Sequence, residues 1–227
     1  MRLSERGNPV KTHTTAQLWV QVCVAATIST QLALGQDNDQ EPTDDGLRLT
    51  LLFDVSNSTT GLTAVSQAVG IDLVERLNEG RDVGQVITFG QKVSIVQEFT
   101  SDRGRLKSAI MALHSESSTT SLFNAIYIAF RGASEPDDQR RRDVIVVVSD
   151  GDDTGSLVTE ENLKGAAASS AAAFYAITVK SRRGSDVGVL RALAKATGGQ
   201  AFEPRDTQEV EMSCREIAVA MARGKRP

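Results

Sequence analysis

The sequence predicts an α/β domain with a doubly wound, mostly parallel sheet that is covered by helices on both faces. Two observations lead to this fold class. Short apolar runs suited to buried strands alternate along the chain with segments whose apolar residues recur at helical spacing, a pattern typical of right-handed crossover units. The connection around Gly90 is too short for a crossover, so the two strands that flank it are expected to be antiparallel, with one at an edge of the sheet.

The individual elements follow from the apolar pattern, and the β-branched run DVIVVV is typical of a central strand. The expected strands are residues 47–53, 82–89, 92–99, 143–148, 174–179 and 200–203. The expected helices are residues 63–77, 106–113, 122–130, 160–172, 187–197 and 207–222. Gly80 is expected to stop the first helix and Ser101 or Asp102 to cap the second. Gly198 and Gly199 are expected to stop the fifth helix rather than to bind phosphate.

The amino-terminal segment differs from the rest of the chain. Three basic residues precede an apolar stretch at residues 18–34, which ends in the small-residue pattern Ala33-Leu34-Gly35. This layout is typical of a secretory signal peptide, here residues 1–35. An uncleaved membrane anchor and an internal core helix are the alternatives. The positive end stays in the cytoplasm in the first two cases, so the domain is expected to be periplasmic or secreted, or else anchored and facing the periplasm.

The remaining chain divides into an acidic linker at residues 36–46, a domain at residues 47–222 and a basic tail at residues 223–227. The linker has no apolar residue and is expected to be solvated. A formal net charge of −4, with no basic run interleaved with aromatic residues, argues against nucleic-acid binding. Removal of residues 1–35 would leave Cys214 as the one cysteine, so an internal disulfide is excluded and a buried apolar role is expected for its side chain.

Oxygen-bearing side chains stand at three of the expected strand or loop ends. Asp54, Ser56 and Ser58 alternate after the first strand (DVSNS), Thr120 precedes the third helix (TTSLFNAI), and Asp150 follows the central strand (SDGDD). In doubly wound sheets ligands bind beyond the carboxyl ends of the strands. Two carboxylates and three hydroxyls are the ligands that a hard divalent cation such as Mg²⁺ prefers. For Ser56 or Ser58, a helix cap is the alternative role.

Together, these motifs resemble the metal-ion-dependent adhesion site of von Willebrand factor type A (VWA) domains, as in integrin inserted domains. The resemblance covers nearly the whole predicted domain, and the runs VSDGDDTGS, YAITV and LAKATGGQAF are similar to the bacterial branch of acidobacterial VWFA-related proteins. It implies a complete site in a Rossmann-like VWA fold. In that site Ser56 and Ser58 would bind the metal directly, Thr120 directly or through water, and Asp54 and Asp150 mainly through water.

The resemblance also implies a function without catalysis. A VWA module would hold Mg²⁺, with Mn²⁺ or Ca²⁺ as alternatives, and would bind the Asp or Glu carboxylate of a protein partner at the open coordination position of the cation. The sequence departs from the family pattern at Asn57, which stands where Gly is usual, at Thr119, which also replaces a Gly, and at Asn124, where Asp is common. None of these departures removes an oxygen ligand, and Thr119 is expected to stiffen its loop.

Two other functions stay open, a metal-dependent hydrolase and a purely structural envelope domain. The hydrolase would depend on His114, the one histidine beyond the signal segment, but neither a GxSxG elbow nor a GxxxxGK[ST] loop is present. His114 is therefore expected to be a surface residue. Asp152 and Asp153 are expected to form a solvated turn rather than a second metal site. Residues 140–142, three arginines, are expected to form a self-pairing charged loop with Asp137 and Asp138, with an interaction patch as the alternative.

Overall fold

The computed structural model describes residues 46–57, 61–115, 118–135, 141–179 and 186–222. The predicted signal peptide, the linker up to residue 45, the basic tail, Ser58, Arg140 and the Asp137-Asp138 pair lie outside these ranges. The strands are β1 (Leu47–Asp54), β2 (Val83–Phe89), β3 (Val93–Thr100), β4 (Arg142–Ser149), β5 (Ala173–Thr178) and β6 (Ala201–Phe202). The helices are α2 (Leu62–Glu75), α3 (Arg103–Met111), α4 (Leu122–Ala133), α5 (Glu160–Ser169), α6 (Val187–Ala196) and α7 (Thr207–Ala222). Within these ranges, no helix is both long enough and apolar enough to cross a membrane.

The strands form one six-stranded sheet in the order β3-β2-β1-β4-β5-β6. All neighbouring pairs are parallel except β2 and β3, which are antiparallel and joined through the turn at Gly90. The predicted fold class, with its antiparallel edge strand, is therefore confirmed. The strand order reverses between β1 and β4, because the chain leaves β1 toward β2 on one side and later returns to place β4 on the other. This switch point is where such folds bind ligands.

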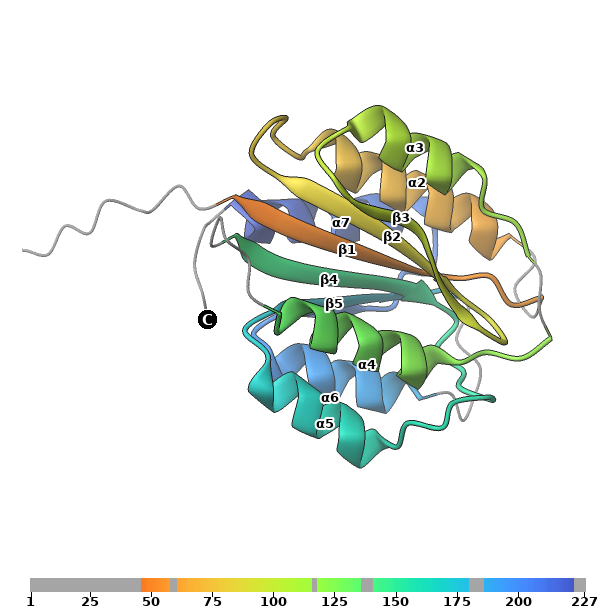
Figure 1. Ribbon diagram of the computed structural model, residues 1–227. Helices are drawn as coiled ribbons and strands as arrows, with labels where there is room; N and C mark the ends of the chain where they lie inside the picture. The colour runs from red at the N-terminus through yellow and green to blue at the C-terminus, as the bar shows by residue number, and fades with distance from the viewer. Residues whose placement is uncertain (1–45, 58–60, 116–117, 136–140, 180–185, 223–227) are drawn as a thin grey trace, which may run out of the picture. The chain divides into compact units, whose positions relative to one another are not determined.

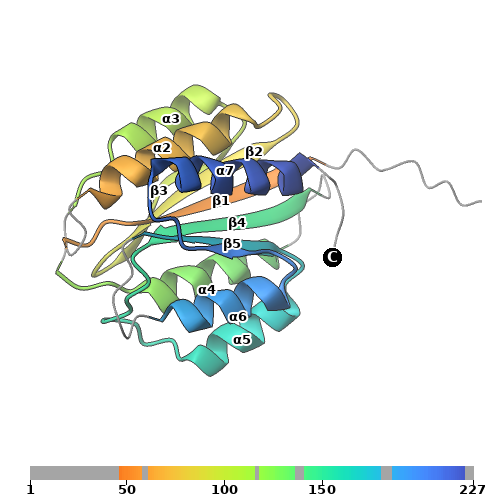
Figure 2. The ribbon, with the colours of Figure 1, turned by 180° about the vertical axis from the view of Figure 1, so that it is seen from behind.

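The helices cover both faces of the sheet. Figures 1 and 2 show α2, α3 and α7 on one face and α4, α5 and α6 on the other. Side chains of β1 alternate between the two cores: Leu51 and Phe53 pack with the α2 side, while Leu52 packs with the α4 side. Residues 144–148 of β4 are buried throughout, which confirms the central position expected from DVIVVV. The site therefore stands on a sheet that two apolar layers hold in place.

The end of α2 and the start of β2 differ from the sequence prediction because a polar side chain redirects the chain. Helix α2 ends at Glu75, before the predicted Gly80 stop, and Gly80 lies in the following turn with a φ of 79°. In that turn one carboxylate oxygen of Asp82 accepts the Asn78 N–H at 2.8 Å, and the other accepts the Leu47 N–H at 3.0 Å. Asp82 therefore closes the turn and supports β1, and strand β2 begins one residue later than expected.

Helix α5 is shorter than its alanine content suggests. The prediction ran to residue 172, whereas the helix ends at Ser169 and Ser170 is extended with a ψ of 144°. The Ser170 hydroxyl accepts the Ala172 N–H at 3.1 Å, and the chain then enters β5 at Ala173. A high helix propensity was overridden here by the need to return to the sheet. At α3, by contrast, the expected cap is confirmed, because Asp102 accepts the Arg105 N–H at 3.1 Å.

Two arginines near the amino-terminal ends of β1 and β4, opposite the switch point, donate hydrogen bonds to the last carbonyl groups of helices. Arg48 in β1 is buried, lies 3.2 Å from Asp143 and donates to the carbonyl of Gly132 at 3.0 Å, at the end of α4. Arg142 donates to the carbonyl of Met221 at 2.6 Å, at the end of α7. Arg142 therefore begins a buried strand and caps a helix, and the expectation that it belongs to a self-pairing charged loop was wrong. Cationic groups at a helix carboxyl terminus also interact favourably with its dipole.

Cys214 is buried in α7 among the side chains of the α2 face. Burial raises the pKa of its thiol to about 11, so very little thiolate forms near neutral pH. This agrees with the expected apolar role, because the thiolate rather than the thiol is the reactive form.

Gly198 and Gly199 end α6 as predicted. Gly198 has a φ of 73°, and the Gly199 N–H bonds to the Ala194 carbonyl at 2.8 Å, which closes the helix. A Cβ on Gly199 would overlap the Phe174 carbonyl in β5, lying 2.7 Å from its carbon. The second glycine is therefore needed because two backbone segments approach closely.

We expect Gly199→Ala to lower the free energy of unfolding by about 3 kcal/mol or more, because the backbone of β5 cannot give way as a flexible side chain would. Gly188→Ala in α6 is the matched control, since its added Cβ would meet nothing within 4 Å and should stabilise the helix by about 0.5–1 kcal/mol. Urea unfolding followed by circular dichroism measures both changes. Equal stability of the two variants would contradict this account of Gly199.

Candidate metal centre

Asp54 ends β1 at the switch point and is held by neutral donors. One carboxylate oxygen accepts the Ser56 N–H at 2.9 Å, and the other accepts the hydroxyl of Ser149 at 2.8 Å from the end of β4. The parallel register pairs Phe53 with Val148, and this brings the side chains of the next residues, Asp54 and Ser149, next to each other. Asp54 and Ser56 are both buried. The carboxylate is thus fixed in orientation by groups that come from two adjacent strands.

Asp150 follows β4 directly and is also buried. Its carboxylate accepts the Asp152 N–H at 3.2 Å, and the Gly151 N–H donates to the Ser149 hydroxyl at 3.1 Å. Gly151 has a φ of 84°, a conformation that glycine adopts without a steric penalty. The sharp turn at Gly151 allows the chain to leave the strand while Asp150 stays at the end of the sheet.

Thr120 lies in the segment that leads into α4 and is buried. Its N–H donates to the Thr154 hydroxyl at 2.9 Å, and its carbonyl accepts the N–H groups of Thr154 and Gly155, both at 2.9 Å. The next residue, Ser121, donates its N–H to the Gly90 carbonyl at 2.8 Å. The Thr120 segment is therefore attached to the loop that follows Asp150 and to the β2–β3 turn.

The amino terminus of α4 is capped by the loop between β4 and α5 rather than by its own residues. Ser121, at the N-cap position, makes no side-chain cap. Instead, the Phe123 N–H donates to the Asp153 carboxylate at 3.1 Å, and the Asn124 N–H donates to the Ser156 hydroxyl at 3.0 Å. These bonds satisfy donors that a helix start leaves without intrahelical partners. The capping loop thereby joins the strand end that carries Asp150 to the helix start that carries Thr120.

Asp153 therefore has a structural role that sequence reasoning missed, and its assignment to a solvated turn was wrong. Its carboxylate is only partly exposed and also accepts the Ser156 hydroxyl at 2.6 Å. Ser121 offered a conventional N-cap in the sequence, so no local signal indicated a cap from thirty residues away. The spacing from Asp153 to Phe123 becomes meaningful only when β4 and α4 are placed side by side.

Electrostatics at the centre disfavour a bare negative charge. Burial is the largest effect and raises the pKa of Asp54 above its ordinary value. Hydrogen bonds from Ser56 and Ser149 oppose that rise, and the charge of Asp150 adds to it. Two carboxylates in a poorly solvated place repel one another, and a cation between them would relieve the repulsion.

The structure thus brings Asp54, Ser56 and Asp150 to the switch point and ties the Thr120 segment to the same loops, whereas Ser58 lies outside the described residues. The donors are carboxylate and hydroxyl oxygens, which suit a hard divalent cation such as Mg²⁺. Among the described residues, no three side chains of His, Cys, Asp and Glu gather into a metal cluster. Carboxylate and hydroxyl oxygens also differ from the cysteine and histidine ligands that are typical of a zinc site.

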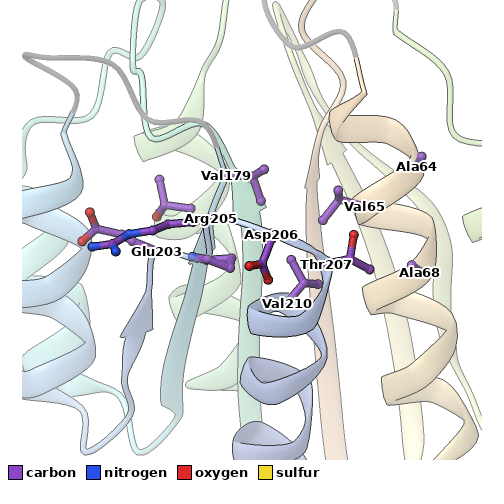
Figure 3. Close-up of a pocket in the computed structure, with 11 residues that line it drawn as sticks. Ala64, Val65, Ala68, Val179, Glu203, Arg205, Asp206, Thr207 and Val210 are labelled. Carbon is purple, nitrogen blue, oxygen red and sulfur yellow. The ribbon is translucent and has the colours of Figure 1, made fainter.

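A separate pocket of about 640 Å³ lies between α2, the end of β5 and the start of α7. In Figure 3, Val65 of α2 points toward Thr207 and Val210 of α7, and Asp206 lies at the start of that helix. None of the candidate metal ligands lines this pocket, and neither a histidine nor a cysteine does. His114 is exposed beyond α3, with its Nδ1 2.9 Å from the Ala112 carbonyl, which agrees with the predicted surface position.

Comparisons with known proteins agree with this architecture. Residues 49–153 match the family model of the von Willebrand factor type A domain. A von Willebrand factor type A structure from Catenulispora acidiphila is similar at a TM-score of 0.63 and 17% identity, covering 78% of this chain. The chain spans only 43% of the length of that structure. No curated protein sequence matches significantly.

Two further solved structures match over nearly their whole length. The conserved hypothetical protein BatB from Bacteroides thetaiotaomicron has a TM-score of 0.58 and 19% identity, over 78% of this chain and 99% of its own. An aerotolerance-related membrane protein from Bacteroides fragilis has a TM-score of 0.61 and 16% identity, over 77% of this chain and 100% of its own. At these identities the likeness shows the fold. Together with the family match, it supports a VWA domain in this chain.

We expect Asp153→Ala to destabilise the domain by about 1–2 kcal/mol, because the Phe123 N–H and the Ser156 hydroxyl lose their shared acceptor. Asp153→Asn is the matched control, since its amide oxygen can still accept one of these bonds, and it should lose clearly less. Urea unfolding measures the difference. If the alanine variant were as stable as the wild type, the capping loop would not hold α4.

Proposed function

We propose that this chain is a non-enzymatic, metal-dependent protein-binding module. It would hold one divalent cation, Mg²⁺ or alternatively Mn²⁺ or Ca²⁺, with the side chains of Asp54, Ser56, Ser58, Thr120 and Asp150. The observation that carries the proposal is the placement of Asp54 and Asp150, two buried carboxylates at adjacent strand ends with hydroxyl groups around them. Two buried carboxylates at adjacent strand ends repel each other, so a bound divalent cation with a preference for oxygen ligands would stabilise them.

The partner is expected to supply an acidic side chain. With Asp54 and Asp150 acting mainly through water, the direct ligands would be neutral hydroxyls. The cation would then keep positive charge and, when bound, would act as a Lewis acid toward an anionic oxygen. An Asp or Glu carboxylate of another protein therefore fits the site.

Catalysis is less well supported than binding. A serine hydrolase needs a base within hydrogen-bond reach of its nucleophile. His114 is instead exposed, and its Nδ1 lies 2.9 Å from the carbonyl oxygen of Ala112. The hydroxyl of Ser149 is engaged with Asp54 and Gly151 in a positioning role. A purely structural domain is the remaining alternative, and metal dependence of stability and binding separates it from our proposal.

We also propose that the domain works outside the cytoplasm and belongs to the bacterial branch of acidobacterial VWFA-related proteins. The signal-like residues 1–35 support export, and the runs VSDGDDTGS and LAKATGGQAF support the branch. The similar Bacteroides fragilis protein is described as an aerotolerance-related membrane protein, which is compatible with a place in the cell envelope.

Magnesium or manganese should bind the wild-type domain at one site and raise its melting temperature, because a ligand of the folded state stabilises it by mass action. Asp54→Asn and Thr120→Ala should abolish or strongly weaken that binding in titration calorimetry.

In EDTA, Asp54→Asn should be at least as stable as the wild type, because the neutral amide avoids the burial penalty that raises the pKa of Asp54. Ser149→Ala should weaken metal binding more mildly, since it only frees the carboxylate to turn.

His114→Ala is the control for that experiment and should leave metal binding and melting temperature unchanged. Unaltered magnesium affinity in both Asp54→Asn and Thr120→Ala would reject the site. Turnover of ester or phosphate substrates that required both magnesium and His114 would favour the hydrolase instead.

Export makes its own prediction. When the full chain is expressed in a bacterium with an envelope, the mature protein should begin near Gln36 and appear in the periplasm or medium. Amino-terminal sequencing of the fractionated protein measures this. A full-length chain recovered only from the cytoplasm would show that residues 1–35 are not an export signal.

A further inference from the structure

Leu157 stands out among the apolar side chains of the described surface. It is 93% exposed, whereas the next most exposed large apolar residue, Met111, is 59% exposed. Isolated apolar residues on a protein surface are common and usually need no explanation. Leu157 differs because it lies in the loop between β4 and α5, the same loop that begins with the candidate ligand Asp150.

The backbone that carries Leu157 is held firmly. The N–H groups of Leu157 and Val158 both donate to the side-chain oxygen of Asn124 at 3.1 Å. Just before them, Ser156 bonds to Asp153 at 2.6 Å and accepts the Asn124 N–H at 3.0 Å. These bonds order the backbone at Leu157, and its side chain is exposed to solvent on this support.

Asn124 links the loop that carries Leu157 to helix α4. It belongs to the first turn of α4, which follows Thr120, and it fixes a loop that follows Asp150. The two segments that meet at Asn124 are thus two of the three that carry candidate metal ligands. Gly155, two residues before Leu157, also donates its N–H to the Thr120 carbonyl at 2.9 Å. We therefore expect a partner that reached the cation to meet Leu157 as well.

We propose that Leu157 is an apolar anchor of the partner-binding surface. It would be covered by an apolar side chain or pocket of a protein partner that also offers a carboxylate to the cation. This inference rests on the proposed function and adds the kind of partner that the site selects. The cation alone attracts any accessible carboxylate, so it provides little discrimination. An apolar contact beside it restricts binding to segments in which an acidic residue has an aliphatic or aromatic neighbour.

The pre-formed support strengthens the argument. Ordering a loop on binding costs free energy that is subtracted from affinity. Here the hydrogen bonds to Asn124 already order the backbone, so burial of the leucine would cost little further backbone entropy. Loss of such an anchor is expected to weaken binding about tenfold or more.

A displayed library of random twelve-residue peptides provides a defined probe. Peptides retained by the wild-type chain in magnesium and released by EDTA are sequenced, and selected peptides are synthesised for affinity measurement. We expect an acidic residue near an aliphatic or aromatic residue in the retained set. Leu157→Ala should bind these peptides about tenfold more weakly, and Leu157→Asp should bind them more weakly still, while both keep wild-type magnesium affinity in calorimetry. Met212→Ala is the matched control, because Met212 is 51% exposed on α7 and should have no effect.

The outcomes separate this inference from the function on which it rests. Retained peptides that are acidic without an apolar preference, and that bind Leu157→Asp as well as the wild type, would overturn the anchor and leave the metal-dependent function standing. Retention that is insensitive to EDTA, or no magnesium binding by the wild type, would overturn both. Weakened peptide binding with unchanged magnesium affinity, found in the Leu157 variants and not in Met212→Ala, is the result that the proposal requires.

Discussion

The candidate centre depends on the parallel pairing of β1 with β4. This pairing sets Phe53 opposite Val148 and so brings Asp54 beside Ser149, whose hydroxyl donates to the carboxylate at 2.8 Å. It also creates the point at which the strand order reverses. A slip of the register would separate the two strand ends and turn side chains to the opposite face of the sheet. The apolar cores on both faces hold the register, and the site depends on it.

Helix α4 transmits that order from the sheet to the rest of the centre. Its amino terminus is capped by Asp153 and Ser156 from the loop after β4, and the Arg48 side chain of β1 reaches the carbonyl of Gly132 near its end. The helix is thus fixed at both ends by the two strands that flank the switch point. Thr120 precedes this helix, and its own backbone bonds to Thr154 and Gly155 join it to the same loop. Its position relative to Asp54 therefore follows from tertiary hydrogen bonds.

The centre combines a stable frame with an unfavourable local charge. Burial and the neighbouring Asp150 raise the pKa of Asp54, while hydrogen bonds from Ser56 and Ser149 hold the carboxylate in place. Groups that are costly to keep charged are common at functional sites. Hydrogen bonds between the surrounding loops keep the site folded despite the unfavourable free energy of the buried charges. Leu157, which is exposed to solvent, lies in one of these loops. Binding of a cation and covering of that leucine would both relieve a cost that the folded chain carries alone.

The sequence alone determined the order and type of the elements, the antiparallel edge strand and the position of two carboxylates at strand ends, because apolar periodicity and strand-end position are local properties. It also identified the stop at Gly198-Gly199 and the burial of Cys214. The tertiary structure decided what depends on distant partners. Asp153 became the cap of α4, Arg142 became the cap of α7, and α5 ended early at Ser169. In each case a hydrogen bond or a chain reversal, formed only after packing, overruled the local preference.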